Sequence, residues 1–248
     1  MPHSLFISDL HLSMLTPQTT RRFHYFIRHI APQAEAVYIL GDLFEYWAGD
    51  DDLDSPFHVE ITAALSKLSS LGAKVYIMHG NRDFLMNKHL ADACKAELLI
   101  DPIMLDLYGT PTLLTHGDAL CTDDTAYQAF RQQVRNTTWQ NKFLELPLTQ
   151  RKAQIEQVRA KSESEKQNKS MSIMDVNLQA VNELLIENNF PQLIHGHTHR
   201  PAHHLHHIEG HTCDRWVLGD WDKHANALHC EVDKTIWATF PDESFPEN

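Results

Sequence analysis

Five short segments of the sequence carry side chains that commonly bind metal ions, and each follows an apolar run. They are Asp9-Leu10-His11, Gly41-Asp42, Gly80-Asn81-Arg82-Asp83, His116-Gly117-Asp118 and Gly196-His197-Thr198-His199. Imidazole, carboxylate and amide donors without a thiolate suit hard or borderline ions such as Mn²⁺, Fe²⁺ or Zn²⁺. Seven of these side chains are candidate ligands, more than one tetrahedral ion can bind, and their number suits two ions about 3.5–4 Å apart. They are Asp9, His11, Asp42, Asn81, His116, His197 and His199. The pattern predicts a two-metal site with Asp42 as the bridging ligand.

The apolar runs before these segments have the length and composition of buried strands. Helical patterns separate several of them, and Thr16-Pro17 marks the start of one helix. Alternating strands and helices predict parallel pairing in a layered α/β domain. Because the carboxyl ends of parallel strands open into one crevice, we expect the ligands to meet there. The runs are Leu5–Ile7, Val37–Leu40, Val75–Met78, Thr112–Thr115 and Leu193–His195.

The segment from residue 122 to residue 170 differs from the rest of the chain. No glycine occurs between Gly117 and Gly196, and residues 121–170 hold nine Lys/Arg against six Asp/Glu, a local excess of +3. We expect one domain, residues 1–248, with residues 122–170 as a helical insertion that caps it. Its basic side chains either form a solvated face or face an anionic substrate. Its aromatic side chains either meet lipid or pack the insertion onto the domain.

Composition excludes several other classes of protein. A net charge of −12 opposes general nucleic-acid binding, which needs clustered Lys and Arg. The four cysteines form no C-x-x-C pair, which suits a reducing cytoplasm. The first residues lack the basic region of a signal peptide, and no run approaches the roughly 18 apolar residues of a membrane-spanning helix. We therefore expect a cytoplasmic protein whose membrane contact is peripheral.

The five motifs, in this order, resemble the calcineurin-like metallophosphoesterase superfamily over most of the chain outside the insertion. The resemblance implies an α/β two-sheet sandwich flanked by helices. It implies that Asp9, His11, Asp42 and His199 bind one metal ion, and that Asp42, Asn81, His116 and His197 bind the other. Scaffold proteins of this fold usually lack part of this set, which is complete here. The later histidines from His203 to His211 lie outside the motifs, and we do not expect them to be ligands.

Arg82 departs from the superfamily pattern, in which histidine occupies this position and assists the leaving group. An arginine cannot donate a proton at ordinary pH because its pKa stays above about 12. It can instead bind phosphate oxygens through two nitrogens. The substitution favours a substrate whose leaving group is itself a phosphate, as in a pyrophosphate bond.

The full motifs, including Gly80-Asn81-Arg82-Asp83-Phe84 and Gly196-His197-Thr198-His199-Arg200-Pro201, resemble UDP-2,3-diacylglucosamine pyrophosphohydrolases nearly end to end. This resemblance implies release of UMP and 2,3-diacylglucosamine 1-phosphate (lipid X) during lipid A biosynthesis, with two Mn²⁺ ions. It implies a monomer at the cytoplasmic face of the inner membrane. Asn81, Arg82 and His197 are the expected catalytic residues. The expected substrate contacts are Asn81, Arg82, Asp124, Ser162, Lys166, Lys169 and His197.

One alternative from the same superfamily is an enzyme specific for nucleotides, such as a dinucleoside polyphosphate hydrolase. Arg82 and the long helical insertion both count against it. The net charge of −12 disfavours a nuclease, which would need a basic surface to bind nucleic acid.

Overall fold

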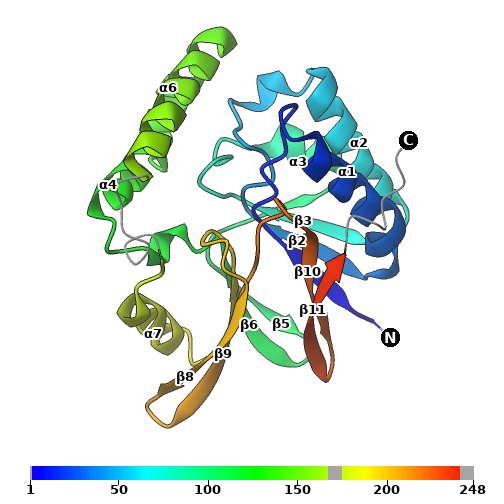
Figure 1. The fold of residues 1–248 in the computed structure, drawn as a ribbon, viewed down its shortest axis with the longest axis vertical. Coiled ribbons are helices and arrows are strands. Elements are labelled where there is room, and N and C mark those ends of the chain that lie inside the picture. Colours follow the sequence, from blue (N-terminus) through cyan, green and yellow to red (C-terminus); the bar gives the residue numbers. More distant parts are fainter. Residues whose placement is uncertain (1, 167–174, 241–248) are drawn as a thin grey trace.

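The computed structural model describes residues 2–166 and 175–240, without the side chains of residues 161 and 163–166. Two sheets form the centre of the molecule (Figure 1). The six-stranded sheet has the order β11-β10-β1-β2-β3-β4. Its strands are β1 (Ser4–Ile7), β2 (Ala36–Leu40), β3 (Lys74–Met78), β4 (Glu97–Leu99), β10 (Ala225–Glu231) and β11 (Lys234–Phe240).

The five-stranded sheet has the order β5-β6-β7-β9-β8. Its strands are β5 (Ile103–Leu107), β6 (Thr110–Thr115), β7 (Gln192–His195), β8 (Ala202–Ile208) and β9 (His211–Val217). All five apolar runs predicted as strands are strands, and β1, β2 and β3 pair in parallel, as do β6 and β7. The ligand-bearing strand ends are divided between two sheets, which confirms the α/β sandwich.

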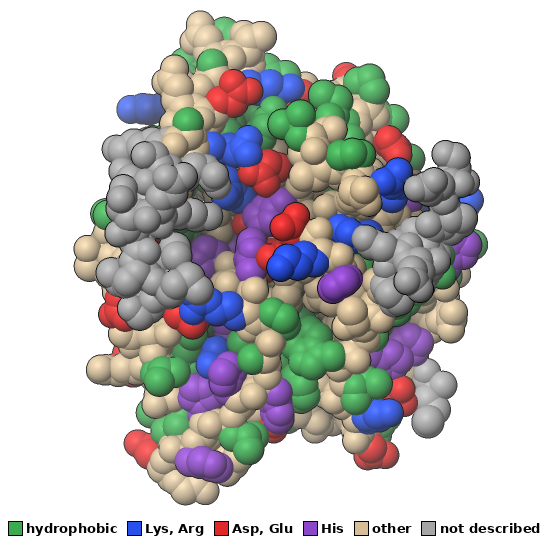
Figure 2. Space-filling view, viewed as in Figure 1, with side chains coloured by type: hydrophobic (Ala, Val, Ile, Leu, Met, Phe, Trp, Pro, Cys, Tyr) green, Lys and Arg blue, Asp and Glu red, His purple; other side chains and the backbone are tan. Residues whose placement is uncertain are grey.

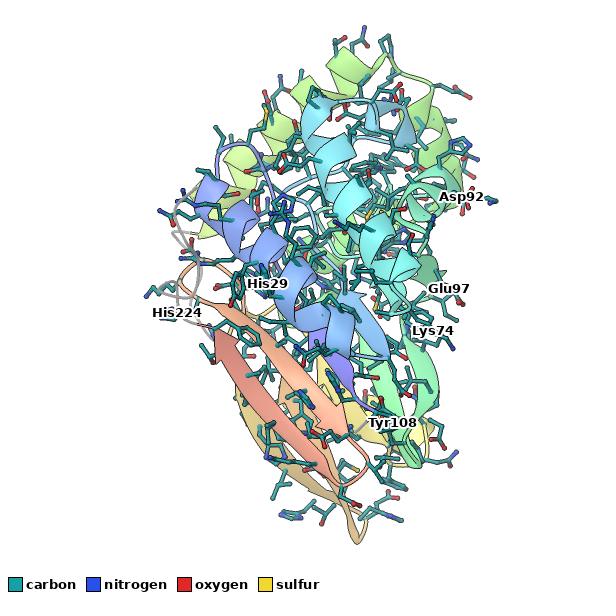
Figure 3. All side chains as sticks on the ribbon, turned by 90° about the vertical axis from the view of Figure 1, so that its right-hand side faces the viewer. His29, Lys74, Asp92, Glu97, Tyr108 and His224 are labelled. Atoms are coloured by element: carbon teal, nitrogen blue, oxygen red, sulfur yellow. The ribbon has the colours of Figure 1, made fainter. Side chains whose placement is uncertain are left out.

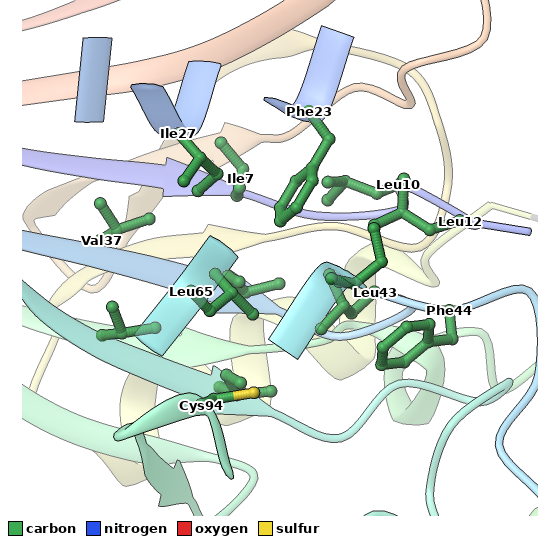
Figure 4. Close-up of a cluster of buried hydrophobic side chains, with 14 of the residues drawn as sticks. Ile7, Leu10, Leu12, Phe23, Ile27, Val37, Leu43, Phe44, Leu65 and Cys94 are labelled. Carbon is green, nitrogen blue, oxygen red and sulfur yellow. The ribbon is translucent and has the colours of Figure 1, made fainter. Parts of the chain in front are cut away.

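Three helices cover the outer face of the six-stranded sheet: α1 (Pro17–Tyr25), α2 (Pro56–Ser70) and α3 (Lys88–Cys94). A π-helical segment, η1 (Phe26–Ile30), continues α1, and Figure 3 shows α1 and α2 side by side. Short 3-10 turns are η2 (Ala31–Gln33), η3 (Asp50–Asp52) and η4 (Asp118–Leu120). Beneath the helices, fully buried Ile7 and Val37 from the strands meet Phe23, Ile27 and Leu65 (Figure 4).

A second apolar cluster lies between the two sheets, where Phe6, Leu40 and Met78 meet Leu114 and Ile194. On the far side of the five-stranded sheet, α7 (Leu178–Glu187) contributes Val181 and Leu185 to a third cluster. The layers are therefore helix, sheet, sheet and helix. Burying the strands on both faces explains why their sequences are continuous apolar runs rather than alternating ones. The four cysteines are buried and unpaired.

The segment predicted to be an insertion, residues 122–170, contains α4 (Thr125–Val134), α5 (Thr137–Leu144) and α6 (Leu148–Lys166), which we call the cap below. Figure 1 shows α6 standing apart from the two sheets, beyond α4. Phe143 is buried, the Trp139 ring stacks on it at 4.9 Å, and both pack against the main apolar cluster. For these aromatic residues the structure therefore supports packing onto the domain. Within the described ranges, no helix is both long and apolar enough to cross a membrane.

Candidate metal centre

The loops after β1, β2 and β7 bring the first predicted group of ligands together. His199 Nε2 lies 3.3 Å from Asp9 Oδ1 and 3.3 Å from His11 Nε2. His11 Nε2 lies 3.8 Å from Asp42 Oδ2. Asp9, His11 and His199 thus form one group of donors close enough to share an ion.

The second group lies on the other side of Asp42. His116 Nε2 is 3.9 Å from Asp42 Oδ2 and 3.0 Å from Asn81 Oδ1. His197 Nδ1 lies 2.8 Å from the same Asn81 oxygen. Asp9, Asp42 and His116 form the second grouping that could hold an ion. The structure therefore gathers all seven predicted ligands, and in Figure 2 histidine, acidic and basic side chains gather in the middle of the face shown.

These residues fit a metal centre chemically. The side chains of Asp9 and Asp42 are 1% and 2% exposed, and two buried carboxylates this close are costly without a compensating cation. Asp9 Oδ2 accepts hydrogen bonds from Ser8 Oγ and the His197 N–H, whereas Asp9 Oδ1 is buried and accepts none. A buried oxygen without a donor, facing an imidazole nitrogen, is suited to coordinate a cation.

The backbone at the ligands adopts a conformation that side chains rarely take. Five of the seven have positive φ: Asp9 (55°), His11 (49°), Asp42 (52°), His197 (69°) and His199 (56°). Such residues cost free energy and occur where the surrounding structure enforces them, often at functional sites. Here the loops support each other, because the Asp9 N–H donates to Gly41 O and the His11 N–H donates to Asp42 O.

Two glycines permit the close approach of these loops. A Cβ at position 80 would lie 2.0 Å from Asp42 Oδ1, and one at position 196 would lie 2.4 Å from Asp9 Oδ2. Neither space can hold a methyl group. Gly80 and Gly196 are therefore required by the proximity of a carboxylate ligand rather than by a turn.

Asp83 ties the β2 and β3 loops together, a role that the sequence did not reveal. Its buried carboxylate accepts hydrogen bonds from the N–H groups of Gly80 and Leu43, each at 2.8 Å, and also from Asp42 at 3.3 Å. Burial, with the nearby Asp42 charge, raises the pKa of Asp83 to about 6. Its place as the last residue of the Gly-Asn-Arg-Asp motif could have suggested a role for Asp83. The hydrogen-bond partners of its carboxylate are known only from the folded structure.

The first cap helix lies against the metal centre. Tyr127 of α4 stacks its ring over His197, with centroids 6.0 Å apart, and donates a hydrogen bond to buried Asp118 at 2.6 Å. Arg131 pairs with the same carboxylate at 2.9 Å. Arg135 donates to Gly80 O at 2.9 Å. The cap and the metal-binding loops thus share a buried polar network.

Arg82 lies at the edge of the centre and faces the cap. Its Nη1 is 3.4 Å from Glu45 Oε1, and the same oxygen pairs with Arg159 of α6. His11 Nδ1 lies 3.3 Å from the other Glu45 oxygen. Burial opposes ionisation of Glu45, but its contact with His11 and the two guanidinium groups lower its pKa to about 2. Two arginines from distant segments therefore meet beside the ligands, and Arg159 was not among the predicted residues.

The remaining predicted substrate contacts lie on the cap or outside the described residues. Asp124 is the N-cap of α4 and accepts from the Tyr127 N–H at 3.1 Å. Ser162 follows Arg159 by one turn of α6, on the same side of that helix. Lys166 is the last residue of α6, and its side chain is not described. Lys169 lies outside the described residues.

The fold and the ligand set define a class of protein, and sequence comparison agrees. A family model described as calcineurin-like phosphoesterase matches residues 3–201, so the chain belongs to that family. It is a metal-dependent hydrolase.

Individual relatives match this chain over most of their length. The chain is 51% identical to the UDP-2,3-diacylglucosamine hydrolase of Aromatoleum aromaticum, over 91% of both chains. A protein of the same name from Cellvibrio japonicus is 48% identical over 88% of this chain and 91% of its own. The protein of this name from Serratia proteamaculans is 46% identical over 96% of this chain and 99% of its own.

Proposed function

We propose that this chain hydrolyses the pyrophosphate bond of UDP-2,3-diacylglucosamine to UMP and lipid X, a step of lipid A biosynthesis. The names of its relatives support the substrate. The observation that carries the proposal is the position of Arg82, which presents a permanent cation beside the seven gathered ligands. A permanent cation suits a leaving group that departs as a phosphate and needs no proton.

Two divalent ions, proposed to be Mn²⁺, would be held by these residues. Asp9, His11, Asp42 and His199 would hold one, and Asp42, Asn81, His116 and His197 the other. The intermediate position of Asp42 Oδ2, 3.8 Å from His11 Nε2 and 3.9 Å from His116 Nε2, supports its role as the bridge. When bound, such ions supply a water of lowered pKa and positive charge against the phosphoryl oxygens.

The protein side chains then bind and orient the substrate. Arg82 would grip a phosphate oxygen, because its present partner Glu45 is shared with Arg159 and His11 and can be exchanged for a phosphate. The Asn81 amide oxygen lies 3.0 Å from His116 Nε2 and 2.8 Å from His197 Nδ1, so these three groups are placed to share one ion. Tyr127, stacked on His197, would close the site toward the cap.

The cap is proposed to receive the acylated half of the substrate. Asp124, Ser162, Lys166, Lys169 and His197 are the proposed contacts in addition to Asn81 and Arg82. Ser162 lies on the side of α6 that carries Arg159, which supports its inclusion. Two acyl chains in the substrate imply peripheral contact with the inner membrane.

The first test is hydrolysis of UDP-2,3-diacylglucosamine by metal-stripped protein, with and without added Mn²⁺. Release of UMP and lipid X that depends on Mn²⁺ is the expected result. If protein with verified bound metal turns over nucleotide substrates and ignores the diacylated one, the proposal is wrong and a nucleotide-specific phosphoesterase replaces it.

The same assay in ¹⁸O-labelled water locates the attack. We expect the label in UMP, because the proposed attack is on the α-phosphorus with lipid X phosphate as leaving group. Label in lipid X would contradict this part of the proposal.

A further inference from the structure

A cavity of about 570 Å³ lies next to the metal centre and is not used by the function proposed above. It is bounded by the start of α7, the loop after β7 and the β8–β9 hairpin. Thr198, one of its lining residues, lies between the ligands His197 and His199, so the cavity adjoins the centre. Its apolar wall consists of Val176, Leu178, Pro201, Ala202 and Val217.

Arg215 of β9 places a buried cation at this cavity. The residue is only 4% exposed, and it lines the cavity. Its Nε donates to His206 Nε2 at 3.0 Å, and its Nη1 lies 3.1 Å from His195 Nε2. Nη2 takes part in neither contact. Both of these contacts are therefore to imidazole nitrogens and not to a carboxylate.

The guanidinium of Arg215 is only partly compensated, because burial lowers its pKa and the carboxylate of nearby Asp175 offsets this only in part. Within residues 2–166 and 175–240, no carboxylate lies within ion-pair distance of it. The nearby acid, Asp175, pairs with Arg200 at 2.6 Å. Cations are seldom buried without a partner, because desolvation costs several kcal/mol. The cavity is lined by two guanidinium groups, those of Arg200 and Arg215, and by one carboxylate, that of Asp175.

We propose that this cavity binds a phosphate-bearing anion, with Arg215 as its anchor. A phosphate group would supply the missing negative charge, and the apolar wall would accept the uncharged part of a larger ligand. Because the cavity adjoins the metal centre, its expected ligand is the nucleotide half of the substrate, and that choice rests on the proposed function. Inorganic phosphate is the other source of the same chemistry.

The strand register offers a test that leaves Arg215 in place. His204 of β8 is the direct cross-strand partner of Arg215, and it is exposed. A carboxylate introduced by His204→Glu would pair with Arg215 and occupy the place of the anion. His207→Glu makes the same charge change on the opposite face of the same strand, where His207 contacts Thr212, and serves as the control.

Phosphate binding is measured by calorimetry on the full-length, Mn²⁺-loaded protein. The wild type and His207→Glu are expected to show a phosphate site in addition to the metal centre. His204→Glu should weaken the additional site about 10- to 100-fold, the effect of losing a charge-assisted hydrogen bond. An additional site that His204→Glu leaves unchanged, or none in the wild type, would overturn the proposal. Thermal unfolding verifies that the variants are folded.

Titrations with UMP, uridine and inorganic phosphate distinguish the two sources. UMP binding more tightly than phosphate at the site removed by His204→Glu would assign it to the nucleotide. Equal binding of both would assign it to the phosphate group alone. The assay of UDP-2,3-diacylglucosamine hydrolysis is separate: if that fails while His204→Glu still removes phosphate binding, the cavity proposal stands and the proposed function does not.

Discussion

The metal-binding loops and the helical cap are held in place by different kinds of contact. The loops are joined by backbone hydrogen bonds, by the buried carboxylate of Asp83 and by glycines that admit no side chain. The outer part of the cap is joined to the domain by long side chains. Arg151 reaches Ala48 O at 2.7 Å, and Lys152 reaches Asp52 at 2.6 Å.

This difference indicates where each region tolerates change. A backbone hydrogen bond cannot lengthen without moving the loop, so a small displacement of one loop moves the candidate ligand that it carries. A contact made by a partly exposed, flexible side chain, such as that of Arg159 with Glu45, can be replaced by water or by substrate at small cost. Deleting residues 122–170 would not separate these effects, because it would also remove Phe143 from the core and Arg135 from Gly80. Point substitutions compare the two regions more sharply.

Gly80→Ala should have the largest effect. The added methyl group would lie 2.0 Å from Asp42 Oδ1, so the bridging ligand must move. We expect loss of metal binding and a fall in activity of more than about 100-fold, the typical consequence of a 1 Å misplacement in an active site. Gly72→Ala, where the added methyl group would meet open space, is the control for a glycine substitution that causes no clash. Equal metal loss in both variants would contradict the role assigned to Gly80.

Arg82→Gln should have the next largest effect. The Arg82 N–H still donates to Asp42 Oδ1 in this variant, so the loop and metal binding should persist. We expect kcat/KM to fall about 100- to 1,000-fold, as when one group that stabilises a transition state is removed. Metal analysis and steady-state kinetics test this, and reduced metal content would show that Arg82 supports the loop instead.

Arg159→Gln should have a smaller effect, expressed mainly in KM. The side chain is 31% exposed and shares Glu45 with Arg82, so its loss weakens substrate binding without disturbing the ligands. We expect KM to rise about tenfold, the equivalent of roughly 1.4 kcal/mol of binding free energy. Unchanged KM would exclude α6 from the substrate site.

Lys152→Gln should have the smallest effect on activity. Its ion pair with Asp52 lies on the same helix as Arg159 but away from Glu45, and Lys152 is 32% exposed. Because Asp52 is only 5% exposed, losing the charged donor should lower the unfolding free energy by about 1–3 kcal/mol, whereas KM should not change. A KM change as large as that of Arg159→Gln would show that the cap acts through its general position rather than through Arg159.

Much of the metal centre was predictable from the sequence. The candidate ligands, among them Asp9, Asp42 and His116, follow from local patterns, because each donor stands directly after an apolar run. The chemistry of the donors indicated the kind of ion, and Arg82 indicated the kind of leaving group. The prediction of strands at all five runs was confirmed for the same reason: a buried strand requires a short run of apolar residues, which is visible in the sequence.

Other features depend on contacts between segments far apart in the chain. The placement of β6 and β7 in a second sheet, the hydrogen bonds of Asp83 to the β2 loop and the meeting of Arg159 with Glu45 all belong to this kind. In the sequence, Arg215 is an ordinary strand residue, and only the fold buries it in contact with His195 and His206. The sequence by itself determined which groups could bind metal. The tertiary structure decided which charges they meet, because burial and long-range proximity arise only when the sheets pack.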